Sequence, residues 1–276
     1  MHKMVGTLLL AGWLLGVLTR AEAQPRPIGV AYYDMGALCD TVPAPFYPDP
    51  YTPNGERRWT ADRYEAAVDR FAALIDSLGM PLVGLFGVEN EAVALDLAGR
   101  SREDYALLHQ TQNRRDGLDF VLLYHGDRFE PQRWDSGLNW MSVEGLFDGE
   151  PIALILCRYS RYVEEEIERI LAQSDRPLIV MGGATFSAGL GLRDGLERVH
   201  RAGRGNRFVQ GCWTRGDSFY LTPDLRVVRG DIYLREWLLD EEDFAPCPLY
   251  DRRDYRGGYS AKLPLFIYLN RGELEN

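Results

Sequence analysis

Chemistry in this chain would have to come from scattered polar residues, because the usual patterns of metal ligands are absent. There is no C-x-x-C pair and the histidines are far apart, so a zinc site built from cysteine and histidine is not expected. The even number of cysteines permits one or two disulfides without assigning their pairing. The residues concerned are His2, His109, His125, His200, Cys39, Cys157, Cys212 and Cys247.

Cys157 would be a nucleophile only if a base or a cation lowered its pKa. No histidine lies near it in the sequence, and Arg158 and Lys262 are the cations that could serve. Packing or a disulfide therefore explains this cysteine better than nucleophilic catalysis does.

The elements that must position these residues alternate between apolar and amphipathic segments, which is typical of an α/β fold. One helix is expected between an N-cap at Thr60 and a stop at Gly79, and a second over 163–171. Five prolines within 42–53 predict an extended loop. Six mostly continuous apolar segments predict strands buried on both faces, at 28–33, 82–88, 118–124, 152–157, 177–181 and 265–269.

The first 23 residues have the pattern of a secretory signal peptide. An apolar run from Met4 to Leu18 follows a short basic flank, and Ala21-Glu22-Ala23 fits an A-x-A cleavage site. The run is shorter than the about 20 residues that a membrane-spanning helix needs, which favours cleavage over a retained anchor. We expect residues 1–23 to be removed, residues 24–276 to form one domain without a membrane span, and the protein to be secreted or periplasmic.

The charge of the chain disfavours nucleic acid as a partner. Its formal net charge is −10 at pH 7, whereas nonspecific binding to nucleic acid needs an excess of lysine and arginine. An unidentified protein or small molecule is the expected partner. A disulfide-stabilised module that binds carbohydrate or a surface is a further alternative, with weak support from Trp59, Trp134, Trp140 and Trp213.

Near its end the chain reads Gly257-Gly258-Tyr259-Ser260-Ala261-Lys262-Leu263-Pro264. This segment resembles the motif G-G-[FY]-S-D-H-L-P of secreted bacterial members of the endonuclease/exonuclease/phosphatase superfamily. Residues 31–41 resemble the opening strand and loop of that superfamily, and 52–60 resemble the segment before its first helix. The resemblance runs from about residue 28 to residue 269. It implies a four-layer α/β sandwich, with two mixed or mainly antiparallel sheets packed face to face and helices outside.

The resemblance also implies a chemistry, which is phosphoester hydrolysis. In such a site acidic and amide side chains hold Mg²⁺, an Asp activates water, and a His with its Asp partner stabilises charge on the phosphoryl group. Asp34 takes the place of the first-strand Asn, and Gly36 that of the Glu that follows it. Gly87 takes the place of the principal metal-binding Glu.

The remaining motifs have lost their functional residues in the same way. Cys157 stands where the superfamily has a catalytic His, and Gly183 stands at the water-activating Asp. Thr185 stands at an Asn, while Ala261 and Lys262 replace the closing Asp-His pair. The resemblance therefore indicates a degenerate active site with no confident catalytic residue and no metal ligands.

A residual pocket is expected from the polar residues that remain, which are Asp34, Glu89, Asp119, Arg161 and Lys262. The ammonium of Lys262 could pair with Asp34 or Asp119 in place of a metal, or it could extend into water. Asp119 is either a residual site carboxylate or a structural one at the start of a strand. Glu89 would share the face of Gly87 if that strand continues.

We therefore expect an exported pseudoenzyme that binds or scaffolds through its old pocket or the proline-rich loop and needs no cofactor. The alternative is a divergent metal-dependent phosphoesterase, either a nuclease or a phosphatase, and Mg²⁺ would be a cofactor only in that case.

Overall fold

Two six-stranded mixed sheets form the centre of the structure, a computed structural model that describes residues 27–45, 49–112, 114–158, 161–183 and 188–271. The first sheet has the strand order β13-β16-β1-β2-β4-β3, and the second has the order β5-β6-β7-β8-β12-β9. The strands of the first sheet are β1 (Ile28–Leu38), β2 (Leu82–Val88), β3 (Tyr105–Gln110), β4 (Asp119–His125), β13 (Leu225–Ile232) and β16 (Leu265–Arg271). Those of the second are β5 (Phe129–Gly137), β6 (Trp140–Phe147), β7 (Glu150–Arg158), β8 (Leu178–Gly183), β9 (Arg193–Asp194) and β12 (Ser218–Leu221).

Helices cover the outer faces of this pair of sheets. The apolar faces of α1 (Ala61–Leu78) and α2 (Glu91–Arg100) join the large core cluster, and both helices contact strands of the first sheet. Buried residues of α3 (Arg161–Gln173) pack with residues of β7 and β8 in a second cluster. The layers are thus helix, sheet, sheet and helix, which confirms the expected four-layer α/β sandwich.

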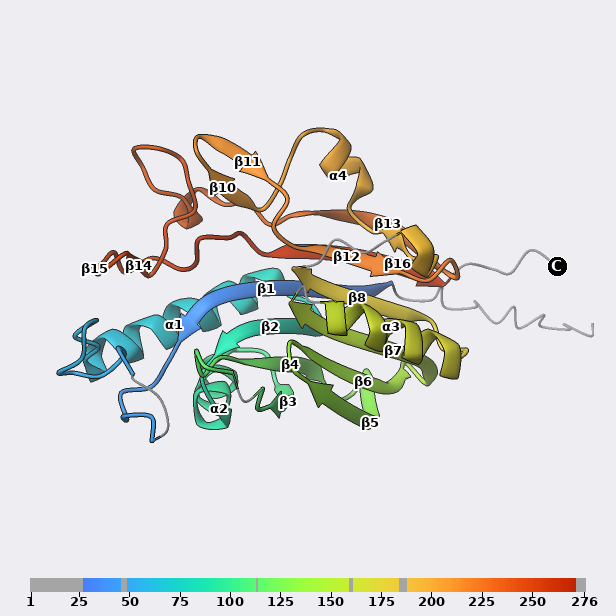
Figure 1. Cartoon of the computed structure of the whole chain (residues 1–276), viewed down its shortest axis with the longest axis horizontal. Coiled ribbons are helices and arrows are strands. Elements are labelled where there is room, and N and C mark those ends of the chain that lie inside the picture. The colour runs from blue at the N-terminus through green and yellow to red at the C-terminus, as the bar shows by residue number, and fades with distance from the viewer. Residues whose placement is uncertain (1–26, 46–48, 113, 159–160, 184–187, 272–276) are drawn as a thin grey trace, which may run out of the picture.

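Smaller elements follow β8 and gather on one side of the sheets (Figure 1). The hairpin β10 (Arg207–Val209) and β11 (Cys212–Thr214) lies near the short helix α4 (Glu197–Arg201), and β14 (Tyr250–Asp251) pairs with β15 (Asp254–Tyr255). Two 3₁₀ turns are present at Ala188–Leu190 and Glu236–Leu238. None of the helices in the described part of the chain has the length and hydropathy of a membrane span.

All six predicted strands are confirmed, and so is the first helix with its boundaries. Thr60 caps α1 by accepting a hydrogen bond from the backbone N–H of Arg63, and Gly79 ends it in the left-handed conformation. The sequence analysis missed α2, which starts directly after β2 with Asn90 as its cap. It also missed strands with solvent-facing positions, such as β5, because polar residues interrupt their apolar pattern.

The cysteines and tryptophans do not support a disulfide-stabilised binding module. All four cysteines are free thiols, with Cys39 and Cys157 buried in different core clusters, so the permitted disulfides do not form. Trp59 and Trp140 are buried and cannot stack on a ligand. Trp134 is exposed, and Trp213 is partly buried against the core.

Candidate functional site

Lys262 is the centre of the candidate site, and its side chain points inward. Its Nζ lies 2.8 Å from Asp34 Oδ2 and 2.7 Å from Asp217 Oδ1. The side chain of Lys262 is only 19% exposed, and that of Asp217 is 1% exposed. One ammonium therefore bridges two carboxylates, one on β1 and one directly before β12.

Backbone and amide groups hold this ion triad in place. Asn206 donates from Nδ2 to Asp217 Oδ2 at 2.9 Å and to the carbonyl of Leu263 at 3.0 Å. The hydroxyl of Ser260 donates to the carbonyl of Asp34 at 2.6 Å. These bonds fasten the segment that carries Lys262 to the first sheet on one side and to the approach to β12 on the other.

The pKa shifts follow from burial and from the mutual attraction of these charges. Burial raises the pKa of the Asp217 carboxyl, an effect that Lys262 opposes and Asp34 reinforces. Burial also disfavours the ammonium of Lys262, but Asp217 and Asp34 outweigh this effect and raise its pKa above the ordinary 10.5. The ammonium is therefore charged throughout the physiological pH range.

Asp217 and Asn206 were missed by the sequence analysis. Asp217 directly precedes a strand of four residues, which is too short to be recognised from its apolar pattern. It is also 45 residues from Lys262 in the chain, so no local motif joins the two. The amino-acid composition did distinguish Lys262 from the other basic residues. Lys262 is the only lysine after Lys3, in a chain whose other basic residues, apart from histidine, are arginines.

Gly87 cannot carry a larger side chain in this backbone. Its φ is +97°, and a Cβ atom there would lie 2.7 Å from the carbonyl oxygen of Gly36, which itself has φ +76°. β2 ends at Val88, and its pairing with β4 shifts register between Phe86 and Val88. The strand therefore does not continue to Glu89, and the condition under which Glu89 would share the face of Gly87 is not met.

Glu89 and Asp119 have structural partners of their own. Glu89 Oε2 accepts from the backbone N–H of Asp40 at 2.8 Å. Asp119 binds the His109 ring at 2.9 Å and accepts from the backbone N–H of Gln112 at 2.7 Å. Of the two carboxylates proposed for Lys262, only Asp34 pairs with it.

The other predicted positions lack groups that could act on a substrate. Burial raises the pKa of the Cys157 thiol, and Asp217 adds to the effect, so this cysteine stays protonated. Gly183 offers no side chain, although a Cβ there would lie 3.0 Å from Asp217 Oδ1. Ala261 is exposed. Thr185 and the side chain of Arg161 lie outside the described part of the chain.

The residues of this site do not fit Mg²⁺. A magnesium ion needs several oxygen ligands around an open centre, whereas here an ammonium lies between the two carboxylates. Among the described residues there is no group of three or more His, Cys, Asp or Glu side chains that could hold a metal ion.

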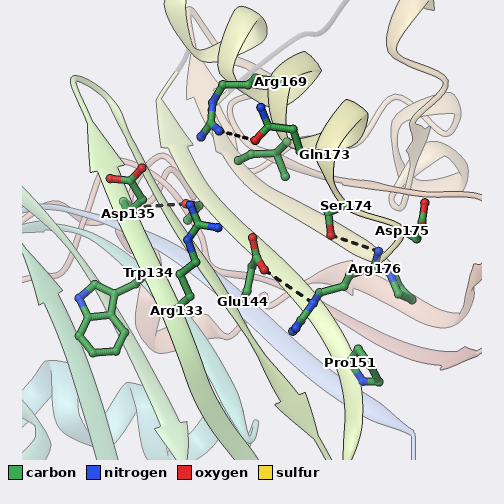
Figure 2. A pocket seen from close by; sticks show the side chains of 13 residues that line it. Arg133, Trp134, Asp135, Glu144, Pro151, Arg169, Gln173, Ser174, Asp175 and Arg176 are labelled. Carbon is green, nitrogen blue, oxygen red and sulfur yellow. Dashed lines mark hydrogen bonds and ion pairs between the residues drawn. The ribbon is translucent and has the colours of Figure 1, made fainter.

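A groove of the described surface lies elsewhere, between α3 and the strands β5 and β6. It has a volume of about 630 Å³, and among the charged residues that line it Glu144 and Arg176 pair with each other. Arg169 bonds Glu166 and Gln173, and Arg176 lies 3.6 Å from Glu144 (Figure 2). The ring of Trp134 points away from the groove, so it offers no aromatic platform there.

Comparison with known proteins agrees with this geometry. The family model described as "Endonuclease/Exonuclease/phosphatase family" matches residues 29–158. Residues 29–158 of the chain are therefore similar to the endonuclease/exonuclease/phosphatase family. Comparison with curated proteins finds no match.

Solved structures show the same fold at low identity. A humanized TDP2 of D. rerio is 13% identical, with a TM-score of 0.57 over 88% of this chain and 99% of that one. A family protein of Bacteroides thetaiotaomicron is 14% identical, with a TM-score of 0.57 over 92% and 98%. A mannosyl-6-phosphatase of the same organism is 14% identical, with a TM-score of 0.55 over 88% and 99%. At these identities the likeness establishes the endonuclease/exonuclease/phosphatase fold and nothing finer.

Replacing Lys262 by Met tests the ion triad. We expect Lys262→Met to lower the free energy of unfolding by about 3 kcal/mol at pH 7, because two carboxylates stay buried without their cation. Since the pKa of Lys262 is raised in the folded state, its contribution is complete below pH 10.5 and is lost as the pH rises through the folded value. The difference between wild type and variant, measured by urea denaturation, should therefore shrink above pH 10.5.

Arg100→Met is the matched control for this measurement. Arg100 pairs with Glu65 and Asp69 on the surface, so its loss should change stability by less than about 1 kcal/mol. An equal effect of the two substitutions at pH 7 would contradict a special role for Lys262.

Gly87→Ala tests the backbone constraint. We expect a loss of about 1–3 kcal/mol from the positive φ alone, and more from the contact with Gly36. Gly99→Ala in α2 is the control, because a Cβ there meets nothing within 4 Å and alanine favours a helix. Thermal denaturation of both variants checks this, and a Gly87→Ala protein as stable as wild type would refute it.

Proposed function

We propose that this protein of the endonuclease/exonuclease/phosphatase fold is a pseudoenzyme, exported from the cell, that acts by binding rather than by hydrolysis. The observation that supports this most directly is the ammonium of Lys262, held at 2.8 and 2.7 Å between Asp34 and Asp217. The ammonium occupies the place between the two carboxylates, so a metal ion could bind both of them only by displacing it.

The chemistry around this charge supports the same proposal. A metal-dependent phosphoesterase needs a group that activates water and a group that stabilises the charge on the phosphoryl oxygens. Gly183 supplies no side chain, and the protonated thiol of Cys157 is a poor base. Lys262 has both of its observed bonds directed at carboxylates. TDP2 and the mannosyl-6-phosphatase share the fold, which makes a divergent phosphoesterase the alternative to be tested.

A titration with divalent metal and an assay of hydrolysis separate the two functions. With Mg²⁺, Mn²⁺ or Ca²⁺ we expect no saturable heat by calorimetry and no hydrolysis of bis(p-nitrophenyl) phosphate or p-nitrophenyl phosphate above the buffer rate. The physical reason is that a divalent ion would have to displace Lys262 from both of its carboxylates. Stoichiometric micromolar binding of metal would overturn the proposal.

Any hydrolysis that is detected must be traced to this chain. Activity that disappears in Asp34→Asn would establish the phosphoesterase alternative, because this change removes a charge at the site. Activity that survives in Asp34→Asn and in Asp119→Asn belongs to a contaminant and leaves the absence of hydrolysis by this chain in place.

Export is proposed from the pattern of the first 23 residues. We expect the mature protein to begin at Gln24, because signal peptidases cut after small residues such as Ala23. Mass spectrometry of the protein from a native host, fractionated into cytoplasm, envelope and medium, would measure this. Recovery of the intact N-terminus in the cytoplasm would contradict export without affecting the proposal of lost catalysis.

A further inference from the structure

A second groove, distinct from the site around Lys262, lies between α4 and β13. Its volume is about 460 Å³, which is within the range of sites for small organic ligands. Four buried side chains form its apolar floor, one directly before α4 and one each on α4, β12 and β13, namely Leu196, Val199, Leu221 and Leu225. β13 is the edge strand of the first sheet, so no further strand of that sheet covers it (Figure 1).

The charged residues of this groove are strongly unbalanced. Four arginines and two acids line it. Asp194 is already bound by His200 at 2.8 Å and by Arg215 at 3.0 Å, and Glu197 is paired with Arg201 at 2.6 Å. The basic residues that pair with these two acids, His200, Arg215 and Arg201, do not themselves line the groove.

The four arginines, in contrast, have no acidic partner among the described residues. Arg198, Arg226 and Arg229 are exposed and form no ion pair there. Arg193 donates to the backbone carbonyls of Pro223 at 2.5 Å and Leu225 at 2.7 Å, which fixes its guanidinium but leaves its charge uncompensated. The groove thus presents guanidinium groups whose charge nothing in the described chain cancels.

A β-bulge in β13 places two of these arginines on the strand face opposite to Leu225, where the guanidinium of Arg229 also lies 5.5 Å from the centroid of the Phe266 ring. The register with β16 shifts between Val227 and Arg229, so that Arg226 lies opposite Asn270 and Arg229 lies opposite Tyr268. Because positions 268 and 270 share one face of β16, Arg226 and Arg229 share one face of β13 although they are three residues apart. In a regular strand they would point to opposite faces.

The groove beside α3 provides a contrast within the same molecule. There Arg176 lies 3.6 Å from Glu144 (Figure 2). Arg169 pairs with Glu166, so two of the three arginines that line this groove have an acidic partner. The amino-acid composition around the groove between α4 and β13 also shows an excess of positive charge. Residues 193–235 contain nine arginines and five acidic residues, in a chain whose net charge is −10.

We propose that the groove between α4 and β13 binds a small organic molecule through a tetrahedral oxyanion group, as in a phosphate or sulfate ester. Guanidinium groups form paired hydrogen bonds with such oxygens, and the apolar floor would contact the uncharged part of the ligand. No side chain of the Lys262 site lines this groove, so the inference does not depend on the loss of catalysis.

Calorimetric titration with matched sugars tests the proposal. Glucose 6-phosphate and glucose 6-sulfate are compared with glucose at low ionic strength, where surface charges are weakly screened. We expect saturable one-to-one binding of at least one ester and none of glucose, and the ester that binds identifies the anion. Failure of both esters to bind would overturn the proposal.

Variants from opposite walls of the groove locate the binding. Arg198→Ala and Arg226→Ala should each weaken the binding of the ester about tenfold, because each loses a charged hydrogen bond, while thermal stability stays unchanged. Arg133→Ala is the matched control, since Arg133 is an exposed arginine that lines the other groove. Equal weakening by all three variants, or no weakening by the first two, would show that the groove is not the site.

Discussion

The contact on which this structure depends is the one between the ammonium of Lys262 and the carboxylates of Asp34 and Asp217. Two buried acids at the junction of two sheets repel each other and resist dehydration, so a cation between them stabilises the folded state at neutral pH. In this chain the cation is a side chain of the protein itself, that of Lys262.

The type of the cation is also constrained. Every basic residue after Lys3, apart from the histidines, is an arginine, except at this one position. An ammonium is a compact point charge on a flexible stem, whereas a guanidinium is a broad plane that needs two parallel acceptors. Asp34 and Asp217 lie on different strands or strand ends, and each accepts with one oxygen from the same nitrogen atom, Lys262 Nζ. This geometry favours lysine over the arginine used elsewhere in the chain.

The sequence predicted the parts of the fold that are marked by a run of apolar residues or by a helix cap. The apolar segments gave the central strands of both sheets, and Thr60 and Gly79 gave the limits of α1. The patterns failed where one face of a strand meets water, as in β5, and where a single contact joins distant segments. Asp217 is the clearest case, because nothing near it in the chain marks it as the partner of Lys262. The bulge that aligns Arg226 and Arg229 is equally hidden, since it depends on the register with β16.

Two positions at which the sequence resemblance implies a lost carboxylate, Gly183 and Gly87, differ in the room that their surroundings leave for a side chain. At Gly183 the nearest obstacle to a new side chain is the carboxylate of Asp217, a side-chain atom that can move. At Gly87 the obstacle is the backbone of Gly36, and both glycines adopt positive φ values. A carboxylate at position 87 would require the backbone of β1 or β2 to change conformation, because a Cβ atom there would lie 2.7 Å from the carbonyl oxygen of Gly36. The site is therefore held in its present form by two close backbone segments as well as by the charge of Lys262, and restoring one side chain at a time would not rebuild a metal centre.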